Sequence, residues 1–120
     1  RATTIELGNI DARRDWGYAP DYVDAMHRIV RHDVPDDFVI ATGTLHSVRN
    51  ILERAFAVVG LDYRDHLQFN PEYFRPNEAV ALCGDYSKAA RLLDWCPTRK
   101  LDDTLEEMVR HDIALLGARE

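Results

Sequence analysis

The chain is organised around one charged run, Gly8-Asn9-Ile10-Asp11-Ala12-Arg13-Arg14-Asp15-Trp16-Gly17-Tyr18. An apolar approach, Ile5-Glu6-Leu7, leads into this run, and a helical pattern that opens with Pro20 follows it. The run is too charged to be a buried strand. Connections between ordered elements are where binding residues are usually held, so we expect a loop that carries one.

Length and composition limit the classes of protein that the chain can represent. Its 120 residues are 46% hydrophobic and 30% charged, which fits one folded domain over 1–120. The net charge of −6 argues against a sequence-independent nucleic-acid partner, which needs a basic face. No apolar run approaches the roughly 20 residues that span a bilayer, so no membrane partner is expected either.

The cysteines and histidines show no metal-binding pattern. Cys83 and Cys96 are isolated, and we expect reduced, semi-buried packing residues in a cytoplasmic protein. The five histidines form no paired motif, so we expect no metal site.

The first half of the chain predicts an alternation of strands and helices. A β-branched, alternating segment predicts a strand over 3–7, and Phe38–Ala41 is a wholly apolar run typical of a strand buried on both faces. Apolar residues at helical spacing predict a helix over 20–32, with a stripe of Tyr22, Val23, Met26, Ile29 and Val30. A second helix is predicted from Val48 to Val59, with Ser47 as N-cap and Gly60 at its C-terminal end.

The second half is less regular until the last helix. It predicts a short strand at Leu67–Phe69, a loop over 70–78 and an extended segment over 79–82. A short helix through Ala89 and Leu93, capped by Asp85 or Ser87, and a helix from Asp102 to about Leu116 complete the pattern. We therefore predict the α/β class, with short strands and about four helices.

Two arginines are candidates for binding a diphosphate. Arg14 lies in the charged run, and Arg75 lies before Pro76 in a rigid stretch, with Glu78 three residues further on. The planar guanidinium suits phosphate oxygens, and a nearby carboxylate can accept hydrogen bonds from ribose hydroxyls. Composition alone favours both arginines as surface ion-pair partners, because the chain is acidic overall.

Catalytic and cofactor motifs are missing from these 120 residues. The six glycines are scattered, so no glycine-rich dinucleotide loop exists, and no tyrosine is followed by lysine four residues on. We therefore predict no catalytic, cofactor-binding or metal-binding residue.

Four stretches resemble the GDP-mannose 4,6-dehydratase family of the extended short-chain dehydrogenase/reductases, within the NAD-dependent epimerase/dehydratase superfamily. The stretches are Leu7–Val23, Asp36–Gly43 with the following His46–Arg49, Tyr73–Glu78 with the following Gly84–Ala89, and Glu107–Asp112. The likeness covers the C-terminal, substrate-binding portion, so it implies a small lobe without the Rossmann half.

The resemblance also implies a reaction and a set of binding residues. Such enzymes convert GDP-mannose to GDP-4-dehydro-6-deoxy-mannose plus water with NADP, in GDP-fucose and deoxysugar biosynthesis. By resemblance, Arg14 and Arg75 bind the diphosphate, Glu78 holds the ribose, Gly8–Asn9 lies near the guanine, and Arg49 is a further candidate for substrate binding.

Three interpretations follow from the sequence. The first is the substrate-binding part of such a lyase, inactive alone and without bound NADP. The second is a non-catalytic nucleotide-binding or interaction module derived from that fold, and the third is a generic acidic α/β domain. For the first, the missing Rossmann half or a homo-oligomer is the expected partner, because the lobe alone exposes an apolar patch.

Overall fold

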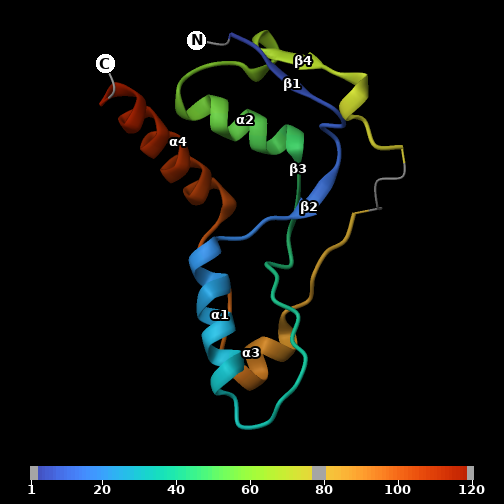
Figure 1. Ribbon diagram of the computed structural model, residues 1–120, viewed down its shortest axis with the longest axis vertical. Helices are drawn as coiled ribbons and strands as arrows, with labels where there is room; N and C mark the ends of the chain where they lie inside the picture. Colours follow the sequence, from blue (N-terminus) through green and yellow to red (C-terminus); the bar gives the residue numbers. More distant parts are fainter. Residues whose placement is uncertain (1–2, 77–80, 119–120) are drawn as a thin grey trace.

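The computed structural model describes residues 3–76 and 81–118, which contain four α-helices and four strands of three residues each (Figure 1). The helices are α1 (Ala19–Arg31), α2 (Val48–Val58), α3 (Ser87–Leu93) and α4 (Leu101–Gly117). The strands are β1 (Ile5–Leu7), β2 (Arg13–Asp15), β3 (Leu45–Ser47) and β4 (Leu67–Phe69), and the 3₁₀ turns are η1 (Tyr63–Asp65) and η2 (Pro71–Tyr73). The predicted α/β class with short strands and four helices is confirmed.

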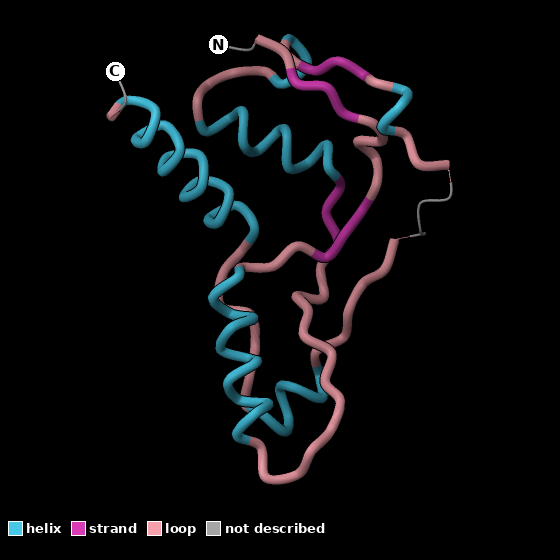
Figure 2. Tube along the Cα trace, viewed as in Figure 1, coloured by secondary structure: helices cyan, strands magenta, loops and turns pink. Residues whose placement is uncertain are grey.

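The strands form two small ribbons instead of one sheet. β1 pairs with β4 in parallel, with Ile5 opposite Leu67, and β2 pairs with β3 in antiparallel, with Arg14 opposite His46. Figure 2 shows the second ribbon at the centre of the molecule, between the part that holds α2 and α4 and the arm that holds α1 and α3. A two-stranded ribbon is marginal alone, so packing against helices must hold both.

The prediction that the charged run is a loop is wrong at Arg13–Asp15, which form β2. Alternate side chains on a strand point to opposite faces. A short ribbon between two parts of the molecule leaves both faces partly accessible, so charged side chains are tolerated there. Arg13 is exposed, and Arg14 and Asp15 are half-buried.

Helix α2 matches its prediction closely. The hydroxyl of Ser47 accepts a hydrogen bond from the Asn50 N–H at 3.1 Å, and the Asn50 side chain accepts one from the Ser47 N–H at 3.2 Å. This reciprocal capping box satisfies two donors at the helix start. Gly60, with φ of 71°, takes the left-handed conformation expected after the helix end.

The main buried cluster lies in the arm between α1 and α3. Trp95 is 2% exposed and packs with Ala25, Ala89 and Leu93. Its indole N–H donates to the carbonyl of Asp21 at 2.8 Å, which joins the segment after α3 to the first turn of α1. The arm is therefore held by one aromatic side chain that spans two helices.

The predicted apolar stripe of α1 is only partly buried. Val23, Met26 and Val30 are 63%, 63% and 84% exposed, whereas Ala25 is fully buried. The periodicity located the helix correctly, but the described chain covers only one side of the stripe.

The strand predicted at Phe38–Ala41 is absent. Ala41 is buried and Val39 is 55% exposed, and the segment runs beside α3, where the Lys88 ammonium donates to the Asp37 carbonyl at 2.8 Å. A strand requires a neighbour whose backbone groups pair with its own. The described residues supply no such neighbour to 38–41, so an apolar run typical of a buried strand stays unpaired.

The last two helices begin near their predicted starts. The Asp85 carboxylate accepts the Ser87 N–H at 2.9 Å ahead of α3, and α4 begins at Leu101. Met108, Ile113 and Leu116 on α4 are about half exposed, and no residue of this helix is buried. No helix in the described ranges is long and apolar enough to cross a membrane. The expectation of semi-buried cysteines is wrong, because Cys83 and Cys96 are both exposed.

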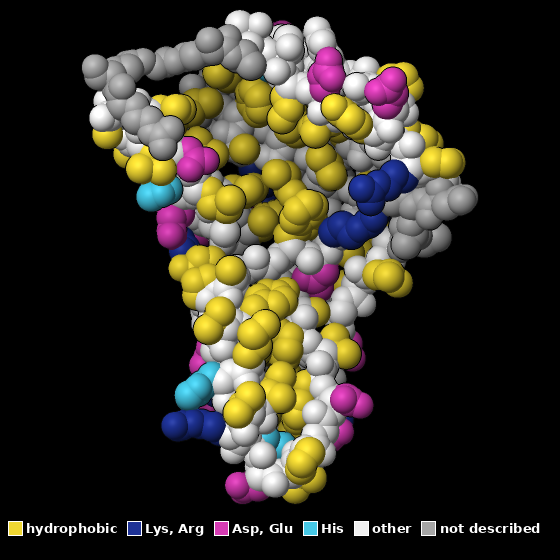
Figure 3. All heavy atoms as spheres, in the orientation of Figure 1, with side chains coloured by type: hydrophobic (Ala, Val, Ile, Leu, Met, Phe, Trp, Pro, Cys, Tyr) yellow, Lys and Arg dark blue, Asp and Glu magenta, His cyan; other side chains and the backbone are white. Residues whose placement is uncertain are grey.

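The molecule is thin and open for its length. Its extents are 52 × 40 × 19 Å and its radius of gyration is 17.5 Å, whereas a compact domain of this length has about 14 Å. Its accessible surface is 8843 Å², against about 6,600 Å² for a compact monomer of this mass. Figure 3 shows hydrophobic side chains in a band along one face, over the arm and up towards α2.

Gly84 offers a test of this packing. A Cβ there would lie 2.1 Å from the Cβ of buried Ala41, so Gly84→Ala forces two segments apart. We expect a loss of about 1–3 kcal/mol in the free energy of unfolding, measured by urea denaturation. Gly117→Ala is the control, because nothing lies within 4 Å of its added Cβ, and unchanged or higher stability is expected. Equal midpoints for both variants would contradict the close approach.

Candidate functional site

The charged run lies at the centre of the candidate site because three other segments pack on it. A Cβ on Gly8 would lie 2.4 Å from the Tyr73 carbonyl oxygen, so only glycine permits this approach between the run and η2. The N–H groups of Val48 and Arg49 donate to the carbonyls of Ala12 and Ile10, at 3.1 and 2.7 Å. The start of α2 and the end of η2 therefore meet the same short stretch.

Asn9 shapes the turn between β1 and β2. Its side-chain oxygen accepts the Asp11 N–H at 3.0 Å, which is an Asx-turn contact. Because Gly8 lies directly under Tyr73, Asn9 is held next to the segment that leads to Arg75. The structure thus brings the predicted guanine-side turn and the predicted Arg75 segment together.

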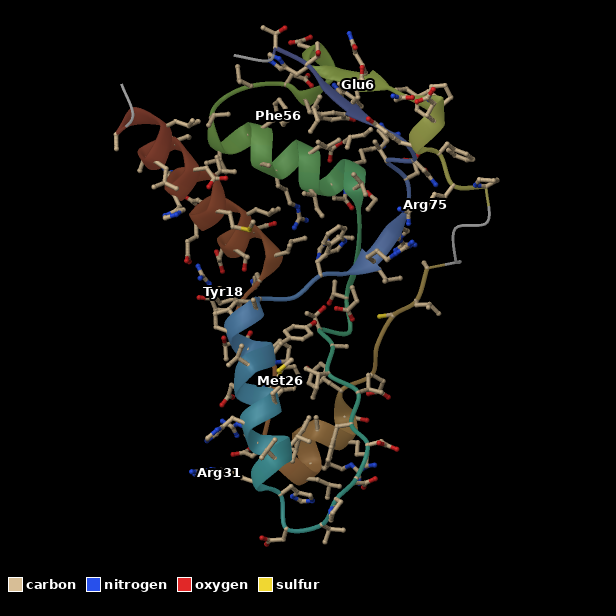
Figure 4. All side chains as sticks on the ribbon, viewed as in Figure 1. Glu6, Tyr18, Met26, Arg31, Phe56 and Arg75 are labelled. Carbon is tan, nitrogen blue, oxygen red and sulfur yellow. The ribbon has the colours of Figure 1, made fainter. Side chains whose placement is uncertain are left out.

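Arg14 lies on β2, and Arg75 lies on the segment that follows η2. Arg14 on β2 pairs through its backbone with His46 on one side and with Leu82, in a parallel bridge, on the other. Arg75 follows η2, is exposed, and points back towards β2 (Figure 4). The loop between them therefore begins against Gly8 and ends beside Arg14. The predicted ribose residue, Glu78, lies outside the described residues.

Arg49 is engaged within the fold. Its guanidinium donates to the Tyr63 hydroxyl at 3.0 Å and to the Asp11 carboxylate at 3.0 Å. These two hydrogen bonds raise the pKa of Arg49. Tyr63 is 3% exposed, so Arg49 ties the turn before β2 to a buried ring. Its predicted role in substrate binding stays a prediction, and its contacts favour a structural one.

Asp15, the residue after Arg14, joins three segments with one carboxylate. It accepts hydrogen bonds from the Thr42 hydroxyl at 2.5 Å, the Thr42 N–H at 2.9 Å, the Gly43 N–H at 3.0 Å and the Gly84 N–H at 3.3 Å. Residues 42–43 follow the unpaired apolar segment, and Gly84 follows Leu82, the bridge partner of Arg14. The carboxylate therefore fixes β2 against both.

Burial by itself would raise the pKa of the Asp15 carboxyl. The hydrogen bonds from Thr42, Gly43 and Gly84 stabilise the charged form more strongly, so the net effect lowers the pKa below 3.8. Sequence reasoning missed this residue. The sequence offered a carboxylate at Asp15 and a Thr-Gly pair at 42–43. Because they are 27 residues apart, their hydrogen bonds could not be predicted from local sequence.

A cavity lies elsewhere in the described chain. It measures 580 Å³ and lies between β3 and the turn that enters α4, with Trp16, Arg54 and Arg99 in its wall. Arg54 is paired with Asp102, and Arg99 is paired with Glu107. None of the predicted substrate residues that the structure describes lines this cavity, and its arginines are already neutralised. It does not have the properties expected of a diphosphate site.

Comparison with known proteins gives the family. The family model described as GDP-mannose 4,6 dehydratase matches residues 1–108. This chain belongs to the GDP-mannose 4,6-dehydratase family. GDP-mannose 4,6 dehydratase 1 of Arabidopsis thaliana is 43% identical over 113 residues, covering 94% of this chain and 31% of that protein. The human GDP-mannose 4,6 dehydratase is 39% identical, with coverages of 93% and 35%. The chain thus spans about a third of these relatives.

Solved structures show the same fold. The UDP-glucose 4-epimerase of Thermotoga maritima, solved with UDP-glucose, matches with a TM-score of 0.81 at 24% identity over 94% of this chain and 36% of that one. RMD from Pseudomonas aeruginosa, complexed with NADPH, matches with a TM-score of 0.79 at 18% identity over 92% of this chain and 36% of that one. Both matches show that this chain shares its fold with about a third of each of these proteins.

The Asp15 cluster makes stability depend on pH in a defined window. Because the folded-state pKa is lowered, Asp15 stabilises the fold above pH 3.8 and loses this effect as the pH falls through its folded value. We expect Asp15→Asn to be clearly less stable than the parent chain near pH 7, with the difference shrinking as the pH falls below 3.8. Urea midpoints across this range measure it, and Glu53→Gln, at an exposed position on α2, is the control. A constant difference at every pH would contradict the assignment.

Proposed function

We propose that residues 1–120 are the nucleotide-sugar-binding lobe of a GDP-mannose 4,6-dehydratase, a lyase, and that they bind GDP-mannose. The observation that carries this proposal is the convergence on Gly8–Asp15: it holds Asn9, Arg14 and both ends of the Arg75 loop together in a chain of this family. In the proposal Arg14 and Arg75 bind the diphosphate, Glu78 the ribose and the Asn9 turn the guanine side.

The chemistry of the two arginines supports the diphosphate role. A diphosphate presents several oxygens with a net negative charge, and two guanidinium groups from different segments can each offer paired donors. Arg14 is held on a strand, and Arg75 follows η2, whose last residue lies against Gly8, so both arginines extend from segments that the fold holds in place. In a chain of net charge −6, local arginines are needed to attract such a ligand.

The cofactor belongs to another part of the proposed enzyme. The reaction converts GDP-mannose to GDP-4-dehydro-6-deoxy-mannose plus water and requires NADP to accept and return a hydride. Neither a glycine-rich dinucleotide loop nor a Tyr-x-x-x-Lys pair occurs in these 120 residues. We therefore propose that a Rossmann half supplies both and that this chain alone neither binds NADP nor turns over GDP-mannose. A non-catalytic binding module from the same fold is the alternative, and turnover after reconstitution with that half separates the two.

The open face supports docking of that half. The band of exposed apolar side chains on α1 and the unpaired apolar segment 38–41 lie on the same arm. Figure 4 shows Met26 pointing off α1 beside that segment. Alone, the same face favours self-association. The cytoplasmic location stays a prediction, supported by two free cysteines.

Arg14→Ala and Arg75→Ala should each weaken GDP binding by the chain, measured by titration calorimetry. Loss of a charge-assisted hydrogen bond is worth roughly 1.5–3 kcal/mol, which is about a tenfold to hundredfold weaker affinity. Arg13→Ala is the matched control, because Arg13 lies beside Arg14 on the opposite face of β2 and is exposed. Intact GDP affinity in both arginine variants would show that the diphosphate lies elsewhere.

The exposed stripe on α1 predicts self-association of the isolated chain. We expect size-exclusion chromatography with light scattering to give a mass above 13.8 kDa. Met26→Lys together with Val30→Glu should shift the chain towards the monomer, because charges on an apolar contact resist association. The control is His27→Glu on the same helix, which lies outside the predicted stripe. A monomer at micromolar concentration before any substitution would refute the idea.

A further inference from the structure

We propose that Asp15 is a positioning residue for diphosphate recognition. It has this role without contacting the ligand itself. It acts through Arg14, its neighbour on β2. The proposal rests on the proposed function, in which Arg14 and Arg75 bind the diphosphate.

The geometry places Asp15 where it can set the relation between the two arginines. Arg14 is its immediate neighbour on β2, and the parallel bridge partner of Arg14, Leu82, lies two residues before Gly84. The Asp15 carboxylate accepts the Gly84 N–H at 3.3 Å, so it continues this strand-like contact by one more hydrogen bond. The segment 82–84 is therefore held against β2 at two successive points.

The same carboxylate fixes β2 from the other side. Thr42 and Gly43 donate three hydrogen bonds to it, and they follow Ala41, whose methyl group is in contact range of the Cα of Gly84. Residues 13–15, 41–43 and 82–84 thus meet around one side chain. With β2 held on both sides, the backbone that carries Arg14 is fixed in position.

Only a carboxylate satisfies this environment. All four partners of Asp15 are donors, three backbone N–H groups and one hydroxyl. Asparagine keeps the size but replaces one acceptor oxygen with an NH₂ group, which would face an N–H donor. Because side chains alternate along a strand, Asp15 points to the face opposite Arg14, so its negative charge stays away from the phosphates.

The expected consequence concerns the diphosphate and not the base. Recognition of two phosphates requires both arginines at a fixed separation. If β2 is loosened, ordering it on binding costs free energy and lowers the affinity. Recognition of guanosine with one phosphate depends less on that separation. Loss of Asp15 should therefore lower the affinity for GDP more than the affinity for GMP.

The experiment is calorimetry of the full chain with GDP and with GMP, comparing the ratio of the two affinities. We expect Asp15→Asn to lower the GDP/GMP ratio about tenfold, towards the ratio of Arg14→Ala, with GMP affinity changed by no more than about twofold. Asp85→Asn is the matched control, since Asp85 also accepts a backbone N–H but lies ahead of α3. Equal losses for GDP and GMP would mean a merely structural role and would overturn the proposal.

Substitutions at Thr42 keep the proposal testable if Asp15→Asn does not fold. Thr42→Val removes the hydroxyl donor and leaves the carboxylate, so a smaller fall in the GDP/GMP ratio is expected, and Thr42→Ser should restore it. An unchanged ratio in Thr42→Val would then count against positioning by Asp15. If Arg14→Ala leaves GDP binding intact, the proposed diphosphate site is wrong. If Arg14→Ala lowers the GDP/GMP ratio but the Asp15 variant keeps a normal ratio, only the positioning role of Asp15 is wrong.

Discussion

The hydrogen bonds around the Asp15 carboxylate join parts of the chain that are far apart in the sequence. Thr42 is 27 residues away and Gly84 is 69 residues away, and each belongs to a segment with little regular structure of its own. The ribbons have only three residues per strand, too few to hold such segments by backbone pairing alone. The Asp15 carboxylate, which accepts several hydrogen bonds, holds these segments where longer backbone pairing is lacking. The position of Arg14 depends on it.

Close backbone contacts, together with these hydrogen bonds, hold the segments of the candidate site against one another. Gly8 lets η2 lie against the charged run, and Gly84 lets the returning loop lie against Ala41. At both positions a side chain would occupy space already filled by a neighbouring carbonyl or methyl group. The candidate site is therefore built mainly by contacts between short extended segments, and the helices hold those segments from outside.

Local signals were enough to predict the helices, whereas long-range pairing was not visible in the sequence. Helix α2 carries its own cap in Ser47 and Asn50 and its own terminator in Gly60, so its limits follow from neighbouring residues. The state of 13–15 and of 38–41 depends on which distant strand lies alongside. Residues 13–15 are charged but form a strand, because β3 pairs with them. Residues 38–41 are apolar but form no strand, because none of the described residues pairs with them. For the same reason Arg14 and Arg75 could be singled out by type and resemblance, but Asp15 could not.

The excess of exposed surface has a consequence for how the site would work. A lobe 19 Å thick can present binding residues on an edge, but it cannot enclose a sugar and exclude water from it. The arginines could hold the charged end of a nucleotide sugar at this edge, where exposure costs little because phosphate is strongly hydrated. The reacting sugar needs a second wall, and the apolar band on α1 and the unpaired segment 38–41 offer a surface on which such a wall can pack. In the proposed function, binding of the nucleotide and enclosure of the sugar are therefore separable steps: this chain supplies the arginines for the first, and the second depends on what covers its open face.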